Sequence, residues 1–490
     1  MRIRVAVILA FAISFLGLAA SSASAACPVG MTCSTVTVPL DWSGKKPGTI
    51  ELPLQVSEGD GPVLLNLAGG PGQSTTPFTS YIHHSFESLA PDWRVAVINQ
   101  RGTGGNAIRC RGLQKLPLTD LTVRPRSAVR ACGRRLGSRR GFYSTTSTVR
   151  DLEAVRKAIG VERMAIMGTS YGTYVATRYA RAYPNRVSRL ILDSVVPQED
   201  VDPFLRVHMR RAGKVLRWVC GKGRCEFKSD PARDLARLVR MPARGGKVPG
   251  TNMRVKVNGP ALIDWMTTVF SFEPKRIPAF GRAIHKASRG NYESLFSIAG
   301  VAEKLAAPSP AGELSWGLHA ATLCTDVEFP FSIGTGTRGS REHIASRYLS
   351  AVRARSFWPF NRATAIGNGI PQTCFEWQKT KVTPPPKPGK IKRPVLIITG
   401  QYDLSTPVEY ARRELRRAPK GRLVVVPKLG HGIAFSAECS LLAMAEFLAG
   451  KLKGDPCAGE ARAQSSAMSW TMPAAARWPS AIAAATDGAP

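Results

Sequence analysis

Acidic side chains are scarce in this 490-residue chain, which contains 34 Asp and Glu against 68 Lys and Arg and has a formal net charge of +34. Such an excess can indicate binding to nucleic acid or to an anionic surface. The basic residues are spread along the whole chain, and no DNA- or RNA-binding motif accompanies them. We therefore expect no specific nucleic-acid partner. Electrostatic association with an anionic cell envelope is the functional alternative to a merely solvated basic surface.

Long apolar runs are also lacking, apart from residues 5–20, which follow two arginines near the N-terminus. This run is shorter than the about 20 residues that a membrane span needs, and the small-x-small triplet Ala23-Ser24-Ala25 follows it. We predict a signal peptide over residues 1–25 and a secreted, extracellular protein. Cys27 lies close to the predicted cleavage site, as in a lipoprotein, but the residues before it lack the usual Leu, which argues against lipid anchoring.

Metal-binding and phosphate-binding motifs are missing as well. The chain has no G-x-x-x-x-G-K-[ST] loop. Its ten cysteines, in an exported protein, indicate disulfides rather than a metal site, although spacing alone leaves their connectivity open. Cys220 and Cys225 lie close together as in a zinc knuckle, but no second ligand pair or nearby His completes such a site. We expect no metal and no cofactor.

The chain does contain Gly168-Thr169-Ser170-Tyr171-Gly172, which fits the pattern G-x-S-x-G. Residues 164–167 before it predict a short buried strand, and residues 174–183 behind it predict a helix that Pro184 ends. A serine between glycines at a strand-to-helix turn resembles the nucleophile elbow of a hydrolase. The alternative is a chance turn, since Gly and Ser are common, but the flanking strand and helix favour a catalytic Ser170.

Two titratable residues follow predicted strands downstream of this serine. Residues 394–400 lead to Asp403, and residues 423–426 lead to His431, which alone among seven histidines lies between glycines on such a loop. Open α/β sheets place their ligand sites on the loops at the carboxyl ends of the strands. A single Asp or His would be interpreted as a surface or capping residue. Together they complete the order Ser, Asp, His and predict a triad with Ser170.

The turn Ala68-Gly69-Gly70-Pro71-Gly72 follows another predicted strand, at residues 63–67. A glycine-rich turn of this kind can direct a backbone N–H at a developing oxyanion, with a second N–H from the residue after the nucleophile. The alternatives are an ordinary Gly/Pro turn or a phosphate-binding loop. We predict an oxyanion hole formed by the N–H groups of Gly70 and Tyr171.

The order of predicted elements indicates how the chain is organised. Residues 34–59 alternate in hydropathy like an antiparallel hairpin, and strands alternate with helices over residues 61–198. This pattern predicts an α/β fold with a mostly parallel, doubly wound sheet. The pattern stops after residue 198 and resumes at Pro394, behind a proline-rich linker. The predicted parts are the signal peptide 1–25, the first part of the core 26–199, a mainly helical cap insertion 200–391, the second part of the core 392–457 and a disordered tail 458–490.

Five motifs together resemble the proline iminopeptidase and tripeptidyl aminopeptidase branch of the α/β-hydrolases, and most of all its secreted bacterial tripeptidyl aminopeptidases. They are Gly69-Gly70-Pro71-Gly72, Asn99-Gln100-Arg101-Gly102-Thr103-Gly104, Gly168-Thr169-Ser170-Tyr171-Gly172, the run 403–407 and Gly430-His431-Gly432. The resemblance covers residues 27–457 and implies an α/β-hydrolase fold with a serine mechanism. It implies the same triad and oxyanion hole as above, with Thr406 supporting the acid loop. Ala68 stands where iminopeptidases usually have His, which weakens the case for proline-specific cleavage.

The resemblance also implies how the cysteines pair and what the cap selects. Together with closeness in sequence, it favours the disulfides Cys27–Cys33, Cys110–Cys132, Cys220–Cys225, Cys324–Cys374 and Cys439–Cys457. The family's cap selects peptides with a free N-terminus, whose ammonium group requires a carboxylate. A Cys324–Cys374 bridge would gather the three candidates Asp326, Glu328 and Glu376. For each of them the alternative is pairing with a nearby arginine or exposure to solvent.

The function that these observations favour is a secreted serine exo-peptidase that removes short peptides from free N-termini through an acyl-enzyme. A carboxylesterase or lipase with the same triad is the main alternative, and a non-catalytic basic binding protein on the same scaffold is the third. An epoxide hydrolase or dehalogenase would need a carboxylate where Ser170 stands.

Overall fold

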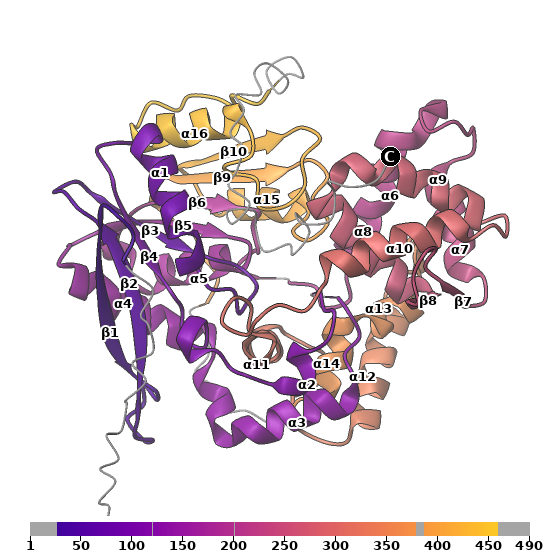
Figure 1. Ribbon diagram of the computed structural model, residues 1–490, viewed down its shortest axis with the longest axis horizontal. Coiled ribbons are helices and arrows are strands. Elements are labelled where there is room, and N and C mark those ends of the chain that lie inside the picture. The colour runs from indigo at the N-terminus through magenta and orange to yellow at the C-terminus, as the bar shows by residue number, and fades with distance from the viewer. Residues whose placement is uncertain (1–26, 120, 200, 379–386, 459–490) are drawn as a thin grey trace, which may run out of the picture.

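The computed structural model describes residues 27–119, 121–199, 201–378 and 387–458 (Figure 1). The predicted signal peptide, nearly all of the predicted tail and part of the proline-rich linker lie outside these residues. Within the described part of the chain, no helix has the length and apolar character needed to cross a membrane.

An eight-stranded sheet forms the core, and its strands lie in the order β1-β2-β4-β3-β5-β6-β9-β10. Strand β2 pairs antiparallel with β1 and β4, and every other neighbouring pair is parallel. This confirms the predicted α/β class and the N-terminal hairpin. The bounds are β1 Met31–Pro39, β2 Thr49–Ser57, β3 Val63–Leu67, β4 Arg94–Ile98, β5 Met164–Thr169, β6 Val187–Asp193, β9 Val395–Gly400 and β10 Gly421–Val426.

The central strands β3 and β9 are buried along their whole length because helices cover both faces of the sheet. All six residues of β9 and all five of β3 are buried, as is usual for strands of a parallel sheet. Apolar side chains of α4, α5 and α15 pack on one face and those of α1 and α16 on the other. The bounds of these helices are α1 Thr79–Leu89, α4 Thr145–Ile159, α5 Tyr171–Ala182, α15 Val408–Leu415 and α16 Glu438–Leu448.

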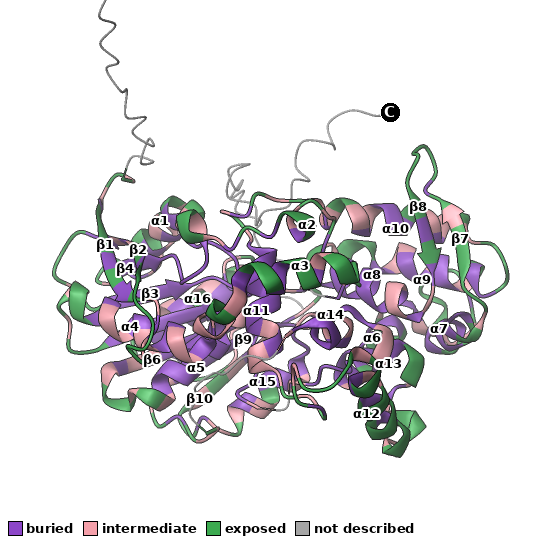
Figure 2. Cartoon of the chain, turned by 90° about the horizontal axis from the view of Figure 1, so that it is seen from below, coloured by how far each residue is buried: buried purple, intermediate pink, exposed green. Residues whose placement is uncertain are grey.

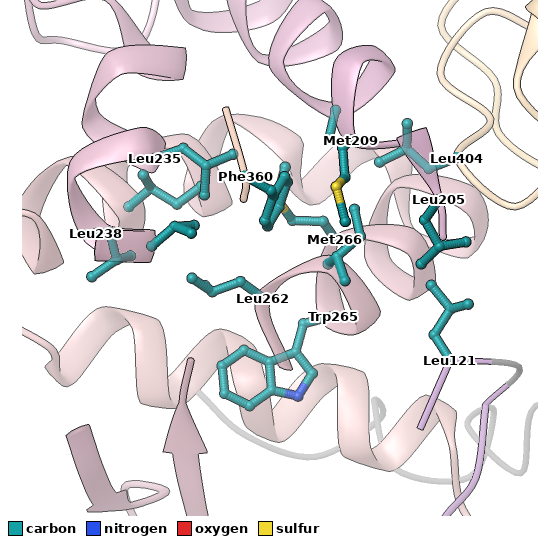
Figure 3. Close-up of a cluster of buried hydrophobic side chains, with 14 of the residues drawn as sticks. Leu121, Leu205, Met209, Leu235, Leu238, Leu262, Trp265, Met266, Phe360 and Leu404 are labelled. Carbon is teal, nitrogen blue, oxygen red and sulfur yellow. The ribbon is translucent and has the colours of Figure 1, made fainter. Parts of the chain in front are cut away.

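The chain between β6 and β9 forms a separate, mainly helical body beside the sheet, here called the cap (Figure 1). Its largest apolar cluster brings together residues such as Met209, Leu235 and Met266, all without exposed surface (Figure 3). Its elements are α6 Arg206–Cys220, α7 Pro231–Arg240, β7 Arg244–Lys247, β8 Arg254–Val257, α8 Gly259–Phe272, α9 Ile277–Ala287, α10 Glu293–Leu305, α11 Trp316–Asp326, α12 Arg338–Ala351, α13 Arg362–Gly367 and α14 Gly369–Glu376.

Two helices that the sequence assigned to the core pack with the cap instead. Helices α2 (Arg111–Gln114) and α3 (Arg126–Leu136) lie between β4 and α4 in the chain. Their apolar side chains share a cluster with Trp316 of the cap and with Trp377, just after α14. Figure 1 shows α2 and α3 beside α11 and α14. The sequence position of α2 and α3 did not indicate this packing, because only tertiary contacts determine whether an inserted segment packs on the sheet or on the cap.

Five disulfides link the ten cysteines, and no described cysteine is free. The pairs are those that the family resemblance implies. Cys110–Cys132 joins the start of α2 to α3, and Cys324–Cys374 joins α11 to α14. A disulfide that closes a local loop typically stabilises a fold by about 2–4 kcal/mol. These two bridges therefore reinforce the group formed by α2, α3, α11 and α14.

The parallel strands place five loops at one edge of the sheet. The loops after β3, β5, β6, β9 and β10 all leave from carboxyl ends and therefore gather at the same edge. Figure 2 shows the buried strands enclosed by helices whose outward faces are exposed. The candidate residues Gly70, Ser170, Asp403 and His431 all belong to these loops.

Candidate active site

Ser170 lies at a sharp turn between β5 and α5, where its backbone has φ 55° and ψ −122°. A side chain other than glycine strains such a conformation by about 1–3 kcal/mol. The turn also requires its glycines. A Cβ at Gly168 would lie 2.4 Å from the Gly172 carbonyl oxygen, and one at Gly172 would lie 2.4 Å from the Leu67 oxygen. The sequence motif therefore folds as a nucleophile elbow, with the serine at the first turn of α5.

Asp403 and His431 are in direct contact. His431 Nδ1 lies 2.9 Å from Asp403 Oδ2, and the aspartate has no exposed surface. The carboxylate also accepts hydrogen bonds from the Ser405 N–H at 2.8 Å, the Thr406 N–H at 2.9 Å and the Thr406 hydroxyl at 2.8 Å. An ionised carboxylate can only accept, so His431 carries its proton on Nδ1 when it is neutral. This leaves Nε2 as the acceptor that a general base needs.

The end of β6 joins the serine loop to the histidine loop, a role that the sequence did not reveal. The Ser170 N–H donates to the Asp193 carbonyl at 2.9 Å. The Asp193 carboxylate accepts the N–H groups of Ile433 at 3.2 Å and Ala434 at 3.0 Å, and the Ser194 hydroxyl accepts that of Gly432 at 2.9 Å. Burial raises the pKa of Asp193, while the Ala434 N–H and the nearby His431 act in the opposite direction. Only its place at the end of a strand marked Asp193 in the sequence.

The glycine-rich turn after β3 packs directly on the elbow. A Cβ at Gly69 would lie 2.8 Å from the Ser170 Cβ, so only glycine permits this approach. Gly70 adopts a φ of +101°, which L side chains rarely adopt. Among the described residues, neither the Gly70 N–H nor the Tyr171 N–H has a hydrogen-bond partner. Both groups are therefore available to bind an oxyanion.

The residues after β4 hold this turn in place. The Asn99 side-chain oxygen accepts hydrogen bonds from the Ser74 hydroxyl at 2.8 Å, the Thr75 N–H at 2.8 Å and the Thr76 N–H at 3.0 Å. The Gln100 side chain donates to the Ala68 carbonyl at 3.1 Å. The Asn99-Gln100 part of the motif therefore shapes the turn around Gly70.

Arg101, the next residue of that motif, has a structural role. Its buried guanidinium makes two hydrogen bonds of 2.6 Å to Asp151 on α4 and also donates to the carbonyls of Leu40 and Phe142. Burial raises the pKa of Asp151, and the arginine opposes that rise. Arg101 thereby ties the N-terminal hairpin and α4 to the loop after β4.

A cavity of about 120 Å³ opens beside Ser170 and is bounded by the cap. Most of its wall is apolar or aromatic, as is usual for the pocket of a small molecule or short peptide. The apolar and aromatic part comprises Pro71, Leu121, Val196, Val201, Leu205, Leu323, Val327, Ile370, Tyr171, Tyr174 and Tyr410. The polar part includes Asp202, His208, Thr267, His319, Asp326 and Thr406. Among the described residues, no group of three or more His, Cys, Asp or Glu could hold a metal ion.

Two family models match the chain. One is described as "alpha/beta hydrolase fold" and covers residues 62–222, and the other is described as "TAP-like protein" and covers residues 360–456. The first stretch contains Gly70 and Ser170, and the second contains Asp403 and His431. These matches and the order of the sheet show that the chain has an α/β-hydrolase fold.

Relatives of this hydrolase carry peptidase names. The tripeptidyl aminopeptidase of Streptomyces lividans is 26% identical over 448 residues, which covers 83% of this chain and 79% of that protein. That of Streptomyces coelicolor is also 26% identical over 448 residues, covering 83% of this chain and 78% of the relative. Serine protease Hip1 of Mycobacterium tuberculosis is 28% identical over 214 residues, covering 38% of this chain and 39% of that protein.

Of the three acidic residues expected near the substrate, the structure brings only Asp326 to the cavity. Its carboxylate accepts hydrogen bonds from the Thr145 hydroxyl and, at 3.1 Å, from the Thr145 N–H. Burial raises the pKa of Asp326 to about 6, although the two bonds from Thr145 act to lower it. The hydrolase therefore has, in the wall of its cavity, a carboxyl group whose pKa of about 6 is closer to neutral pH than that of an ordinary aspartate.

The other two acidic residues, Glu328 and Glu376, do not line the cavity, so the expectation that they lie beside the substrate was wrong. Glu328 is exposed and does not line the cavity. Glu376 pairs with Arg126 at 2.7 Å, Arg130 at 2.5 Å and Arg338 at 3.0 Å. The Cys324–Cys374 bridge does form, but Glu376 is directed at the arginines of α3 and α12, which neutralise its charge.

The sequence also missed three polar residues of the cavity wall. Asp202 accepts the Phe204 N–H at 3.0 Å and the Arg206 N–H and side chain at 2.8 Å each, so its charge is already balanced. Burial lowers the pKa of both His208 and His319, which keeps them neutral. His208 Nε2 lies 3.1 Å from the Ser405 carbonyl and His319 Nδ1 lies 3.2 Å from the Pro71 carbonyl. These histidines therefore support the acid loop and the glycine-rich turn.

Proposed function

We propose that this hydrolase is a serine peptidase in which Ser170, His431 and Asp403 act as the catalytic triad. The observation that carries the proposal is the 2.9 Å contact between His431 Nδ1 and the buried Asp403. Hydrogen bonds to Asp193 at the end of β6 connect the histidine loop to Ser170, which lines the cavity. This arrangement supplies a nucleophile, a base and a group that orients the base.

In the proposed reaction, the Ser170 hydroxyl attacks the scissile carbonyl and His431 Nε2 accepts its proton. Asp403 holds the imidazole in the required tautomer and stabilises the imidazolium. The N–H groups of Gly70 and Tyr171 bind the tetrahedral oxyanion, and a donor of this kind typically contributes about 10²–10³ in rate. His431 then protonates the leaving amine, and water activated by the same histidine releases the acyl group from Ser170.

The preferred substrate in this proposal is a short peptide with a free N-terminus, from which a tripeptide is removed. The names of the Streptomyces relatives, which align with most of the chain, support this choice. Asp326 supports it as well, because a carboxylate in a mostly apolar cavity can pair with the substrate's ammonium group. The apolar wall favours peptides with apolar side chains.

We further propose that the protein acts outside the cytoplasm. Five disulfides support an oxidising compartment, and the N-terminal pattern of a signal peptide agrees with it. Exposed arginines such as Arg233, Arg237 and Arg240 on α7 support association with an anionic envelope. Protein bound to cell-wall material in this way should wash off with salt, and retention unchanged in high salt would reject the association.

Labelling with a fluorophosphonate tests the serine mechanism directly. The intact protein should be labelled at Ser170, and the Ser170→Ala variant should not react. A wild-type protein that does not react, or a Ser170→Ala variant that does, would reject the mechanism and favour a non-catalytic binding protein.

A substrate panel separates the peptidase from the esterase alternative, which the apolar wall of the cavity also suits. The panel compares chromogenic aminoacyl, tripeptidyl and N-acetylated tripeptidyl substrates with short-chain esters. We expect the free tripeptidyl substrate to give the highest kcat/KM. Equal cleavage of free and acetylated peptides would reject recognition of the N-terminus, and hydrolysis of esters alone would identify a carboxylesterase.

A further inference from the structure

The last turn of cap helix α8 contacts the acid loop of the core. Ser271 is buried, with 3% of its surface exposed. Its hydroxyl oxygen accepts the Ser405 N–H at 3.0 Å and the Leu404 N–H at 3.3 Å. The same hydroxyl donates to Asp403 Oδ1 at 3.5 Å. One side chain from the cap therefore binds three consecutive residues of the loop that carries the acid.

The backbone of the same residue contacts the base loop. The Ser271 carbonyl accepts the His431 N–H at 2.8 Å. Carbonyls in the last turn of a helix have no partner within the helix, so this one is free to bind a neighbouring loop. A Cβ at Gly430 would lie 2.0 Å from the Ser271 oxygen, so only glycine before the histidine permits this approach. The ring of Phe272 meets the His431 ring edge to face, with centroids 5.7 Å apart.

A second cap helix, α6, binds the acid loop from another side. His208 Nε2 lies 3.1 Å from the Ser405 carbonyl, and the guanidinium of Arg211 donates to the Gln401 carbonyl. Both residues are buried. The acid loop is therefore held by α6 and α8 of the cap in addition to its own strand β9.

We propose that Ser271 is a positioning residue for the triad, through which the cap holds the acid and base loops in their reactive geometry. The inference rests on the proposed function, since it assigns Asp403 and His431 their catalytic roles. Ser271 contacts both loops, the acid loop through its side chain and the base loop through its backbone. In this proposal the cap contributes to the chemical step as well as to substrate selection.

Removing the Ser271 hydroxyl tests the inference. In Ser271→Ala the helix and the His431 contact remain, but the Leu404 N–H loses its acceptor and Asp403 loses a donor. We expect kcat and the rate of fluorophosphonate labelling to fall about 10- to 100-fold, because small misplacements of reacting groups have effects of this size. KM should stay within about twofold, because Ser271 does not line the cavity.

Thr268→Val is the matched control. Thr268 lies one turn earlier on α8, is similarly buried, and donates its hydroxyl to the Asp264 carbonyl at 3.0 Å within the helix. Its loss removes a buried hydroxyl of the same helix without touching either loop, and the labelling rate should not change. Ser271→Cys, which keeps the volume and a weak donor, should lie between wild type and Ser271→Ala. It also provides the comparison if the alanine variant does not fold.

The outcomes separate this inference from the proposed function. A wild-type protein that resists the fluorophosphonate would reject the proposed function itself. A wild-type protein that reacts, with Ser271→Ala and Ser271→Cys reacting as fast as Thr268→Val, would overturn the positioning role alone. A loss that appears entirely in KM would overturn it too, because that pattern belongs to a substrate-binding residue.

Discussion

Replacing Asp326 by Asn should make the protein more stable and a poorer enzyme for free peptides. The rise in the pKa of Asp326 from its ordinary 3.8 to about 6 corresponds to about 3 kcal/mol, at about 1.36 kcal/mol for each pKa unit. The folded state binds the proton more tightly than the unfolded state does. The charged carboxylate therefore lowers the free energy of unfolding by its full amount above pH 6, and this loss disappears as the pH falls from 6 to 3.8.

Asn keeps the shape of the side chain and the oxygen that accepts both hydrogen bonds from Thr145, but it never carries a charge. Because part of Asp326 remains accessible, about 3 kcal/mol is an upper bound. We expect Asp326→Asn to raise the free energy of unfolding by about 1–3 kcal/mol at pH 7.5. Near pH 4 the two proteins should unfold with nearly the same free energy.

The same substitution should impair recognition of the substrate. An ammonium left without its carboxylate in a desolvated site loses about 2–5 kcal/mol, which is a fall of about 30-fold or more in kcat/KM at about 1.4 kcal/mol for each factor of ten. N-acetylated peptides lack the ammonium, so the kcat/KM for any residual cleavage of them should change little. Glu328→Gln, an exposed change two residues away, should alter neither stability nor kcat/KM.

Urea denaturation of both proteins at pH 7.5 and pH 4, together with kinetics on paired free and acetylated peptides, measures both effects. A variant less stable than wild type at pH 7.5, or a stability difference that is the same at both pH values, would refute the electrostatic reasoning. Equal losses on free and acetylated peptides would refute the ammonium contact.

Three further predictions concern the sheet edge, the cap and the disulfides. Asp193→Ala leaves the buried N–H groups of Ile433 and Ala434 without acceptors, at about 1–3 kcal/mol each, and should slow fluorophosphonate labelling because the histidine loop loses its anchor. Met266 is a fully buried residue of the cap's largest apolar cluster, and Met266→Ala should lower the free energy of unfolding by about 2–5 kcal/mol, measured by urea denaturation. This variant should slow fluorophosphonate labelling less than Asp193→Ala does, and a larger effect on labelling would contradict the assigned roles. The exported, denatured protein should show no reactive thiol with Ellman's reagent, and two or more thiols per chain would contradict the five bridges.

Local patterns predicted the parts of the site that local structure determines. The elbow follows from glycines on each side of Ser170, and the loops of Asp403 and His431 follow from the apolar, strand-forming runs before them. Parallel pairing then places these loops at one edge of the sheet. The fold class was predicted on the same grounds, because short apolar runs that alternate with helices have few other arrangements, and the observed sheet confirms it.

Contacts between distant segments could not be predicted in this way. Glu376 lies two residues from a bridged cysteine, yet its direction depends on how α14 faces α3 and α12. Ser271 and Asp193 have no distinctive sequence setting. The contacts of Ser271 with the acid and base loops arise only when the cap packs on the sheet, and those of Asp193 with the base loop arise only when the ends of β6 and β10 meet at the sheet edge. Helices α2 and α3 pack with α11 and Trp377 of the cap for the same reason.

The order of the disulfides has a consequence for how the chain can mature. Each bridge joins one cysteine to the next along the chain, at separations of 6, 22, 5, 50 and 18 residues. Consider a chain that emerges from an export channel with its N-terminus first. For the first, third, fifth, seventh and ninth cysteine in chain order, the next cysteine to emerge is then the native partner. An oxidant that couples thiols in order of emergence therefore produces the native pattern directly. With this pairing, a chain exported in that way needs no isomerase to reshuffle wrong pairs.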